Sequence, residues 1–296
     1  MYVRPCEPAE LSFVIESIDR EFVLNKGRRL SLSCRYPNVI SQQNVKHIQV
    51  AVMDHSICGA VAIRMFDYLI GKSLWHGAMI GMVWVEPKYR GKDVGKELIT
   101  TIGTYLKENH CDFGVLWTGQ PLFYQKLGWF ISDTSLYAEI NGNRVSVKTE
   151  PVICRTLNSS DIVHLDKIRI NRELQRVVRA PLDYHVKPIP VDEVDCFFVT
   201  DNEGDGYALV GKADNCGFFY EMDAPPVLWD IIWRAITMQY EKLIINGQRG
   251  EPFSKWLTDM HQIKWQQQNK TMWLPLSQRA YDISLESFYI PYFDRI

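Results

Sequence analysis

The stretch YRGKDVGKEL, residues 89–98, reads as a loop that turns into a helix. The first amides of a helix have no partner inside it and lie at the positive end of its dipole. The two glycines let the backbone approach a ligand closely, and Arg90, Lys92 and Lys96 add positive charge. These features favour an anion site that takes phosphate groups. The alternative is a basic surface turn that caps a helix, and these ten residues alone do not decide between the two.

Apolar spacing on both sides of the loop predicts a mixed α/β fold. The segment AMIGMVWV, residues 78–85, is expected to be a strand that ends before Pro87. After the loop, apolar residues at helical spacing predict a helix to about Asn109. Strand, loop, helix, strand and helix in this order indicate a mixed sheet. The other elements expected in the first half are a helix over 10–22, a strand pair over 47–53 and 58–66, a strand over 113–117, and a short helix over 121–127.

The chain is expected to form two similar domains, 1–147 and 151–296, with a boundary near residues 147–151. Beyond the boundary the order helix, strand, strand, strand, helix begins again. Ser160 and Asp161 are expected to cap the first helix of this second half. The later elements are expected at 196–200, 206–210 and 218–222 for the strands and at 226–238 for the helix.

Composition excludes several classes of protein. The net charge is −2 and no basic block runs along the chain, so no nucleic acid partner is expected. There is no leader-like start and no apolar run of the ~18 residues that span a bilayer, so we expect a cytoplasmic protein that binds no membrane. Seven cysteines occur singly, with no CxxC pair and no HxxxH or HExxH spacing, which predicts buried, reduced thiols and no metal site.

Two motifs carry a resemblance to a known family. The segment VEPKYRGKDVGKEL resembles the acyl-CoA-binding signature Q/R-x-x-G-x-G/A of the GNAT acetyltransferases, with Arg90 first and Gly95 last. About thirty residues later, PLFYQKLGW resembles the Y-x-K-x-G-F/W segment of that family. Two motifs in this order are far more specific than either alone, and the resemblance covers residues 2–140.

The second half is similar, more weakly, to the second GNAT-like domain of tandem enzymes of the enhanced-intracellular-survival type, without their third domain. The likeness lies in RELQRVVRAPLDY, in GYALV followed by FFYEM, and in MWLPL near the end. No counterpart of RGKDVGKEL occurs there. The resemblance therefore implies that the second domain does not bind coenzyme A in the same way. A further expectation is that it forms part of the acceptor site, since ligand sites favour domain interfaces.

The resemblance also implies roles for individual residues. Acetyl-CoA would be the cosubstrate and no metal would be needed. Backbone groups of Val83 and Val85 would hydrogen-bond the pantetheine arm, and Tyr124 would protonate the departing thiolate. The alternative for Tyr124 is an aromatic residue packed in the core. The diphosphate would be held at Arg90, Gly91, Lys92, Asp93, Val94, Gly95 and Lys96.

Asp93 departs from the family signature, which has glycine at this position. A carboxylate beside a diphosphate is unfavourable by about 1 kcal/mol at ~4 Å in water. Aspartate nevertheless tolerates left-handed backbone angles, and as an N-cap it could accept a hydrogen bond from the amide of Lys96. We therefore expect coenzyme A binding that is weakened but retained.

A general base does not emerge from the sequence. The strand before the loop, where many relatives carry a glutamate, has no carboxylate, and Glu86 is expected to face solvent. Asp19, Glu21 and Asp54 lie in segments that could reach the cleft. The aromatic residues Trp84, Trp117 and Trp129 could contact a ligand, although large aromatic side chains are more often in the core.

Three functions remain open at this point. The first is transfer of an acetyl group from acetyl-CoA to a primary amine by direct attack, with a small-molecule, peptide or protein acceptor. The second is a non-catalytic module that binds coenzyme A or has a regulatory role. The third is a tandem scaffold that binds a protein partner and no coenzyme.

Overall fold

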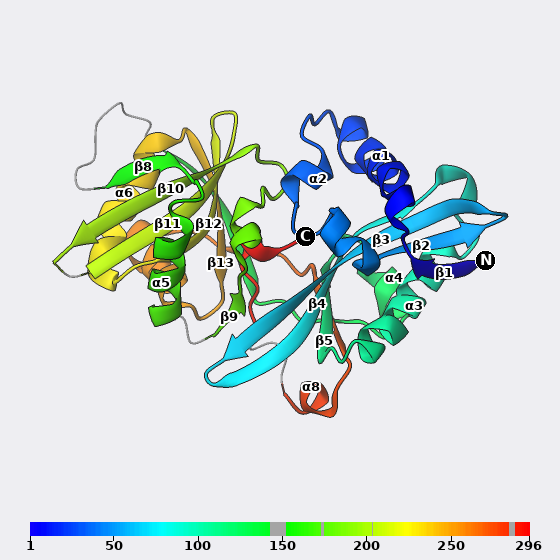
Figure 1. Ribbon diagram of the computed structural model, residues 1–296. Coiled ribbons are helices and arrows are strands. Elements are labelled where there is room, and N and C mark those ends of the chain that lie inside the picture. The colour runs from blue at the N-terminus through cyan, green and yellow to red at the C-terminus, as the bar shows by residue number, and fades with distance from the viewer. Residues whose placement is uncertain (143–151, 173–174, 203, 284–287) are drawn as a thin grey trace.

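The chain folds into two lobes, each built on one β-sheet (Figure 1). This computed structural model describes residues 1–142, 152–172, 175–202, 204–283 and 288–296. The last residues of the chain lie between the lobes, as the C label in Figure 1 shows. Within the described ranges, no helix is long and apolar enough to cross a membrane.

The first sheet contains the elements around the glycine-containing loop. Its strand order is β1-β2-β3-β4-β5-β15-β6, and β9 (Gln175–Val178) pairs with β3. β4 and β5 run parallel, whereas β2, β3 and β4 are antiparallel neighbours. The strands are β1 (Tyr2–Pro5), β2 (Ile48–Met53), β3 (Ser56–Ile70), β4 (Ser73–Val85), β5 (Phe113–Trp117), β6 (Phe130–Ile131) and β15 (Thr271–Pro275).

Helices cover both faces of the first sheet. Alternate residues of β3 point to opposite faces. Ala60 belongs to a cluster with α1 (Leu11–Phe22), whereas Val61 belongs to a cluster with α3 (Val94–Glu108). The other helices of this lobe are short, namely α2 (Leu32–Arg35) and α4 (Pro121–Gln125), with α8 (Gln278–Asp282) packed against β15.

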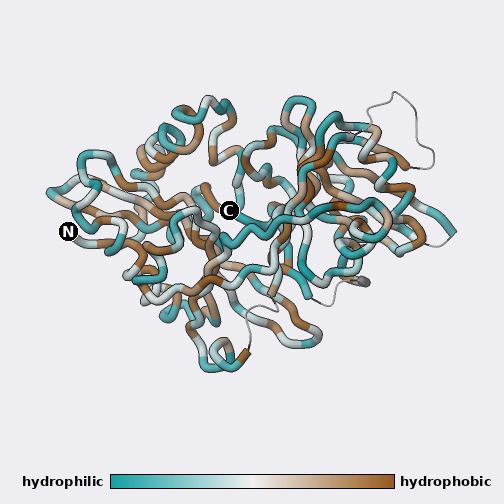
Figure 2. Tube along the Cα trace, turned by 180° about the vertical axis from the view of Figure 1, so that it is seen from behind, coloured by the Kyte–Doolittle hydropathy of each residue, from teal (hydrophilic) through white to brown (hydrophobic). Residues whose placement is uncertain are grey.

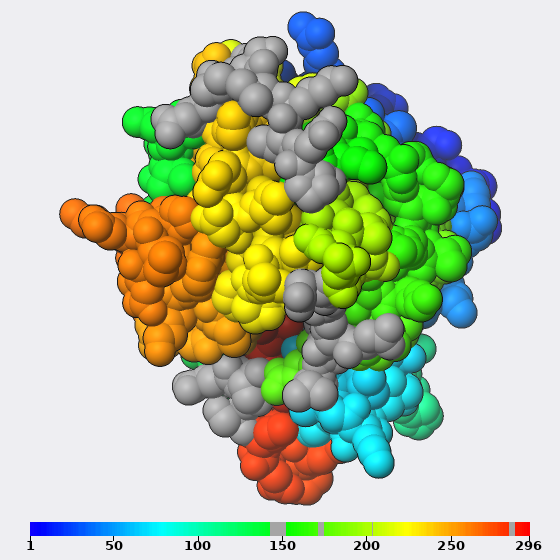
Figure 3. Space-filling view, turned by 90° about the vertical axis from the view of Figure 1, so that its left-hand side faces the viewer, coloured from blue at the N-terminus to red at the C-terminus, as the bar shows by residue number. Residues whose placement is uncertain are grey.

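The second sheet repeats this plan. Its strand order is β14-β7-β13-β12-β11-β10-β8, and β12 and β13 are its parallel pair. Figure 3 views this lobe from outside, where the yellow and orange segments include α6 and α7. Its strands are β7 (Ser135–Asn141), β8 (Ile153–Thr156), β10 (Glu193–Asp201), β11 (Gly204–Ala213), β12 (Cys216–Asp223), β13 (Lys242–Gln248) and β14 (Gln266–Gln267), and its helices are α5 (Ile162–Arg172), α6 (Trp229–Gln239) and α7 (Pro252–His261).

Strands are exchanged between the two halves of the sequence. β7 precedes the expected boundary at 147–151, yet it pairs with β13 in the second sheet. β15 comes from the end of the chain and inserts between β5 and β6 of the first sheet. MWLPL, which the sequence assigned to the second half, is therefore a strand of the first sheet. The two lobes are joined by backbone hydrogen bonds as well as by side chains.

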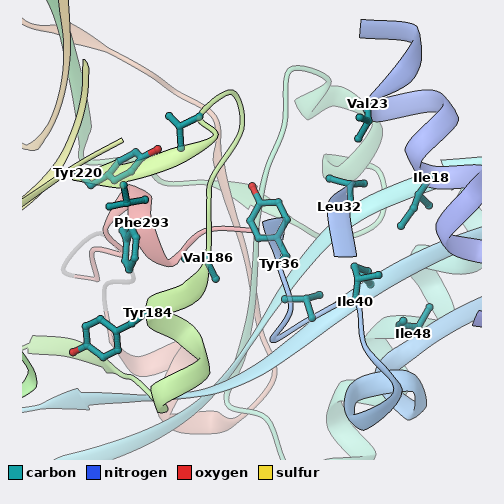
Figure 4. Close-up of a cluster of buried hydrophobic side chains, with 14 of the residues drawn as sticks. Ile18, Val23, Leu32, Tyr36, Ile40, Ile48, Tyr184, Val186, Tyr220 and Phe293 are labelled. Atoms are coloured by element: carbon teal, nitrogen blue, oxygen red, sulfur yellow. The ribbon is translucent and has the colours of Figure 1, made fainter. Parts of the chain in front are cut away.

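One hydrophobic cluster extends from the first lobe into the second (Figure 4). On the first side it contains Leu32 and Tyr36, and on the second side Val186, Tyr220 and Phe293. Figure 2 shows that hydrophobic residues concentrate in the strands of both lobes. Because this cluster is continuous, the lobes pack as one body around the space that holds the end of the chain.

Buried charges reinforce the junction between the lobes. Arg179 donates from Nε and Nη2 to the carboxylate of Asp294 at 2.8 Å, and also pairs with Glu221 of β12. Arg64 of β3 donates to the backbone oxygen of Asp294 and pairs with Asp183 at 3.0 Å. Burial alone would raise the pKa of Asp294, but Arg179 outweighs it and holds that pKa below its usual value.

Most elements expected from periodicity are present. β5 has the expected bounds, α1 and α3 differ from expectation by one residue at an end, and β3 and β4 are longer than expected. The expected burial of all cysteines is wrong for Cys34 and Cys154, which are exposed, and Cys216 is only half-buried. All seven are free thiols. Among the described residues no group of three or more His, Cys, Asp or Glu could hold a metal ion.

Candidate active site

A cleft of about 900 Å³ opens where β4 and β5 separate. These parallel strands pair only over Gly77–Met79 and Phe113–Val115. Beyond this short register β4 keeps its bonds to β3, so its other edge is left without a strand partner. The cleft is therefore a consequence of the separation of β4 and β5. It is lined by the end of β4, the start of α3, the end of β5 and α4.

A bulge changes the backbone of β4 inside the cleft. The register with β3 shifts between Ala60, which faces Trp84, and Ala62, which faces Gly81. Met82 lies within this shift and has a positive φ of 53°. An extra residue of this kind bends a strand and leaves backbone groups outside the ladder. The bulge thus lies at residues of β4 that line the cleft, and it leaves main-chain groups there outside the ladder.

The loop at residues 89–98 borders the cleft with amides that have no protein partner. Gly91 has a φ of +76°, and α3 begins at Val94 after Asp93 as N-cap. Of the amides from 91 to 96, that of Lys92 donates to the Tyr89 carbonyl at 3.3 Å. In the described part of the chain the other five have no backbone or side-chain acceptor. The residues predicted from the sequence that line the cleft are Val83, Val85, Arg90, Gly91, Asp93, Val94, Gly95, Lys96 and Tyr124.

Asp93 adopts the left-handed conformation expected for it, with φ 58° and ψ 9°. The expected hydrogen bond from its side chain to the Lys96 amide is absent: Asp93 makes no side-chain cap. A residue with positive φ turns its side chain away from the usual capping direction, and Asp93 is exposed. The N-terminal amides of α3 therefore remain available, with an exposed carboxylate beside them.

Two cations of the loop are engaged with the protein itself. Arg90 donates from Nε to the Val85 carbonyl at 3.1 Å and from Nη2 to Glu21 at 2.9 Å. Lys92 lies over the ring of Tyr89, 5.3 Å from its centroid, and is not among the cleft-lining residues that the structure describes. Lys96 does line the cleft. Positive charge that faces the cleft at this loop thus comes from Lys96 and from amide dipoles more than from Arg90 and Lys92.

Tyr124 of α4 also lines the cleft. Its ring packs edge-on against Phe123 at 5.0 Å and Trp129 at 6.3 Å between ring centroids. Among the described residues its hydroxyl has no hydrogen-bond partner. Burial raises the pKa of Tyr124 to about 12, so the phenol is protonated at neutral pH. Tyr124 both packs against other aromatic rings and lines the cleft. The interpretation as a packed core residue and the interpretation as a proton donor are therefore compatible.

The carboxylates considered as bases are placed differently. Glu21 lines the cleft but is paired with Arg90. Asp19 accepts from the amide of Leu32 at 2.8 Å and fixes the start of α2. Asp54 lies in the turn between β2 and β3, with a φ of 50°. Of the three tryptophans, Trp84 and Trp117 line the cleft, whereas Trp129 is a core residue.

A second pocket, of about 300 Å³, adjoins the cleft at Phe22, Met82 and Trp117. Its other walls come from both lobes and from the last residues of the chain, including Tyr36, Ile189 and Arg295. The end of the chain packs on β4, because a Cβ added to Gly81 would lie 3.0 Å from the backbone carbon of Ile296. Sequence patterns gave no signal for this pocket, since its lining residues come from segments far apart in the sequence.

Comparison with known proteins identifies the lobe that contains the cleft. Residues 3–132 match the model of the acetyltransferase (GNAT) domain. This part of the first lobe is a GNAT acetyltransferase domain. Comparison with curated protein sequences yields no match.

Solved structures extend the likeness to nearly the whole chain. A GCN5-related N-acetyltransferase from Anabaena variabilis is 13% identical, with a TM-score of 0.73, and the alignment covers 93% of this chain and 73% of that one. A GCN5-related N-acetyltransferase from Kribbella flavida is 14% identical, with a TM-score of 0.68 and coverage of 94% and 72%. Eis1 from Mycobacterium abscessus is 13% identical, with a TM-score of 0.66 and coverage of 94% and 74%. At these identities the likeness establishes the fold, and the GNAT plan spans both lobes.

Proposed function

We propose that the protein transfers an acetyl group from acetyl-CoA to a primary amine by direct attack, with Tyr124 as general acid. The observation that supports this most is the convergence of two features on one cleft. The residues whose amides are unpartnered at the start of α3 and Tyr124, whose hydroxyl has no hydrogen-bond partner among the described residues, line the same cleft. An anion site and a proton donor in one groove are what a thioester cosubstrate with a diphosphate requires.

The cleft is suited to hold an extended molecule. The five free amides between residues 91 and 96 could donate to the diphosphate of acetyl-CoA. The open edge of β4 could bind the pantetheine arm as an added strand, through backbone groups of Val83 and Val85. The Val85 carbonyl already accepts from Arg90, but a carbonyl oxygen has a second lone pair.

The transfer needs no covalent enzyme intermediate. The amine nitrogen attacks the thioester carbon, and the carbonyl oxygen becomes an oxyanion that backbone amides at the Met82 bulge could stabilise. Collapse breaks the C–S bond, and the thiolate takes the proton of Tyr124. The proton lost by the amine leaves to solvent. Holding both reactants in one groove can contribute up to about 7–11 kcal/mol in well-aligned cases.

The pKa of Tyr124 fixes the expected pH profile. A general acid must be protonated, so its contribution is lost only as the pH rises through a value of about 12. The amine must be neutral to attack, so the rate is expected to rise with pH. From pH 6 to 10 the profile should therefore show a rising limb and no falling limb from Tyr124. A falling limb with a midpoint below pH 10 that disappears in Tyr124→Phe would contradict the assigned environment of this phenol.

Release of free thiol from acetyl-CoA over a panel of primary amines tests the proposal. Tyr124→Phe should lower kcat by about 10²-fold or more, because general acid catalysis contributes roughly 10²–10⁴-fold. Its affinity for coenzyme A, measured by calorimetry, should stay unchanged. A suitable control is Tyr105→Phe, on the far end of α3 and outside the cleft. An equal rate in Tyr124→Phe would remove this residue from the mechanism.

The main alternative is a module that binds coenzyme A without catalysis. It is favoured by Asp93 and by Glu21, the acid that lines the cleft but is tied to Arg90. Calorimetry that detects coenzyme A, together with no thiol release for any amine of the panel, would support this alternative. No binding of coenzyme A at all would leave only the scaffold function.

A further inference from the structure

Arg90 connects three elements at the edge of the cleft. Its Nε donates to the Val85 carbonyl at the end of β4, at 3.1 Å, and its Nη2 donates to Glu21 Oε2 in the last turn of α1, at 2.9 Å. All three residues line the cleft of about 900 Å³. The guanidinium therefore lies between β4 and α1, and it joins the loop at residues 89–98 to both.

These contacts use groups that the cosubstrate also needs. In the proposed complex the pantetheine arm bonds main-chain groups of Val85. The diphosphate is held by the unpartnered amides that follow Arg90, the first of which belongs to Gly91. The Arg90 side chain and the cosubstrate therefore meet at the same end of β4. Within the described ranges Nη1 of Arg90 has no acceptor, so the guanidinium has donors left for a phosphate oxygen.

The ion pair between Arg90 and Glu21 is easily exchanged. It joins one nitrogen to one oxygen, and the two side chains keep 50% and 33% of their surface exposed. Ion pairs of this kind contribute little to stability, because water also solvates both partners. A diphosphate carries more negative charge than one carboxylate, and it accepts two parallel hydrogen bonds from a guanidinium. The diphosphate is therefore the stronger partner for Arg90.

Once Arg90 turns to another anion, Glu21 is a carboxylate without a cation. Its Oε1 has no partner among the described residues even in the present pair. The cations on neighbouring segments make other contacts. Arg20 pairs with an acid one turn earlier on α1, Arg28 donates to the Phe22 carbonyl at 2.8 Å, and Lys96 lies beside the diphosphate amides. A half-buried carboxylate that lines the cleft without a counter-ion is a favourable partner for an ammonium group.

We infer that Arg90 is a switch between Glu21 and the diphosphate, and that the released Glu21 binds the ammonium form of the acceptor. This inference rests on the proposed acetyl transfer. Each ligand removes the partner that holds back the other, since the diphosphate frees Glu21 and an ammonium group frees Arg90. The two affinities should therefore rise by the same factor, because coupling between two binding sites is reciprocal. Glu21 thus collects the protonated amine, whose proton then leaves to solvent before the nitrogen attacks.

Calorimetry with coenzyme A tests this coupling without turnover. We would titrate coenzyme A into the protein alone and with an excess of 2-phenylethylamine or 1,4-diaminobutane, at matched ionic strength. The neutral counterparts are 2-phenylethanol and 1,4-butanediol. At least one amine should lower the Kd for coenzyme A about threefold or more, and neither alcohol should change it. If neither amine has a larger effect than its alcohol, the inference is overturned.

Two variants should shift the affinity for coenzyme A in opposite directions. Glu21→Gln leaves Arg90 available to the diphosphate and should lower the Kd about twofold to fivefold. Arg90→Met removes the guanidinium and should raise the Kd about threefold or more. Both variants should abolish the effect of the amine. An ion pair that only holds α1 against the loop would give weaker binding in both variants. That result, or an amine effect that persists in Glu21→Gln, would overturn the inference.

A matched control is Glu16→Gln on the same helix. Glu16 is paired with Arg20 at 3.1 Å, is more exposed than Glu21, and is not among the described residues that line the cleft. This variant removes the same charge from α1 and should keep the wild-type Kd and the effect of the amine. Equal shifts in Glu16→Gln and Glu21→Gln would show a general effect of helix charge, which would contradict the switch.

Thiol release from acetyl-CoA separates failure of this inference from failure of the proposed function. If the amines and variants shift the affinity for coenzyme A as expected but no thiol is released, the acetyl transfer fails and the switch stands. If thiol is released but Glu21→Gln does not tighten coenzyme A binding, the switch fails and the acetyl transfer stands. If the wild-type protein does not bind coenzyme A, both are wrong.

Discussion

In the part of the chain that the structure describes, each lobe has a parallel strand pair that separates into a cleft, but the two clefts differ in the helix starts that border them. β4 and β5 pair over three residues and then diverge around a cleft of about 900 Å³. In the second lobe, Cys216–Phe219 of β12 pairs with Lys242–Ile245 of β13, and the two strands then diverge around a cleft of about 610 Å³. The GNAT plan of strands therefore produces a cavity in both lobes. The separation of the two parallel strands alone does not determine what the cavity binds.

The difference lies in the loops and helix starts around each cleft. In the first lobe the amides of Val94, Gly95 and Lys96 at the start of α3 have no acceptor among the described residues. In the second lobe the chain leaves β12 through Pro225 and Pro226, which have no N–H to donate. At the start of α7, the Glu251 side chain accepts from the amides of Phe253 at 2.9 Å and Ser254 at 2.6 Å. A protein carboxylate thus already occupies the anion position of that helix.

Charge pairing also distinguishes the walls of the second cleft from those of the first. Glu221 lines the second cleft and is bound by Arg179 and by the Tyr207 hydroxyl. Arg179 in turn holds Asp294, so this wall is part of the junction between the lobes. Within the described ranges, the amides at the start of α3 and the Tyr124 hydroxyl of the first cleft have no protein partner, whereas Glu221 and Glu251 of the second cleft are both engaged by the protein. The two clefts therefore differ in how far their polar groups are already paired within the protein.

The largest effect is expected from Arg179→Met, which breaks the wall of the second cleft. The substitution leaves Asp294 and Glu221 as buried carboxylates without their cation, and removing one partner of a buried pair destabilises by about 3–5 kcal/mol. Urea denaturation should show this loss at pH 7. Arg234→Met removes an exposed partner of Asp230 on α6 and should change stability by less than about 1 kcal/mol.

The same network predicts a pH dependence of stability. The pKa of Asp294 is lower in the folded state than in the unfolded chain, because Arg179 outweighs the effect of burial. Its contribution is thus complete above the unfolded pKa, near 4, and is lost as the pH falls through the folded value. The difference in stability between wild type and Arg179→Met should shrink below pH 4. A difference that stays constant into this range would show that the pair does not titrate as described.

A smaller effect is expected from Glu251→Ala, which frees the helix start in the second cleft. Loss of an N-cap should lower the free energy of unfolding by about 0.5–2 kcal/mol. Calorimetry should still give one coenzyme A per chain, because only the first lobe has the glycine loop. A stoichiometry of two would show that a free helix start is sufficient to bind coenzyme A. The difference between the two clefts would then be due to Glu251 alone.

The smallest effect is expected at Asp93, which places an exposed carboxylate beside the helix-start amides of the first cleft. Asp93→Asn keeps the left-handed backbone and removes the charge, and Asp93→Gly also relieves the positive φ. Both should lower the Kd for coenzyme A by up to about fivefold at low salt, corresponding to about 1 kcal/mol at most. The gain should decrease as salt screens the exposed carboxylate. An unchanged Kd in both variants would show that the carboxylate does not penalise the cosubstrate.

Local features of the site were predicted well from the sequence. The loop and α3 follow from glycine positions and helical spacing within a short segment, and the positive φ of Asp93 follows from what aspartate tolerates. The contacts of Arg90 were not predicted, because Glu21 is 69 residues away and surface ion pairs leave no local pattern. The side-chain cap at Asp93 was predicted wrongly, since the left-handed backbone that aspartate allows is not the extended one that a capping side chain needs.

The sequence by itself determined the glycine loop, the helix behind it and the order of elements, because these depend on backbone preferences and spacing within a few residues. Only the tertiary structure decided that β7 and β15 change lobes and that Arg295 reaches a pocket beside Met82. The physical reason is that apolar strands of similar length are nearly interchangeable in local preference. Which of them pair, and which distant side chains then meet, is settled by the packing of the whole chain.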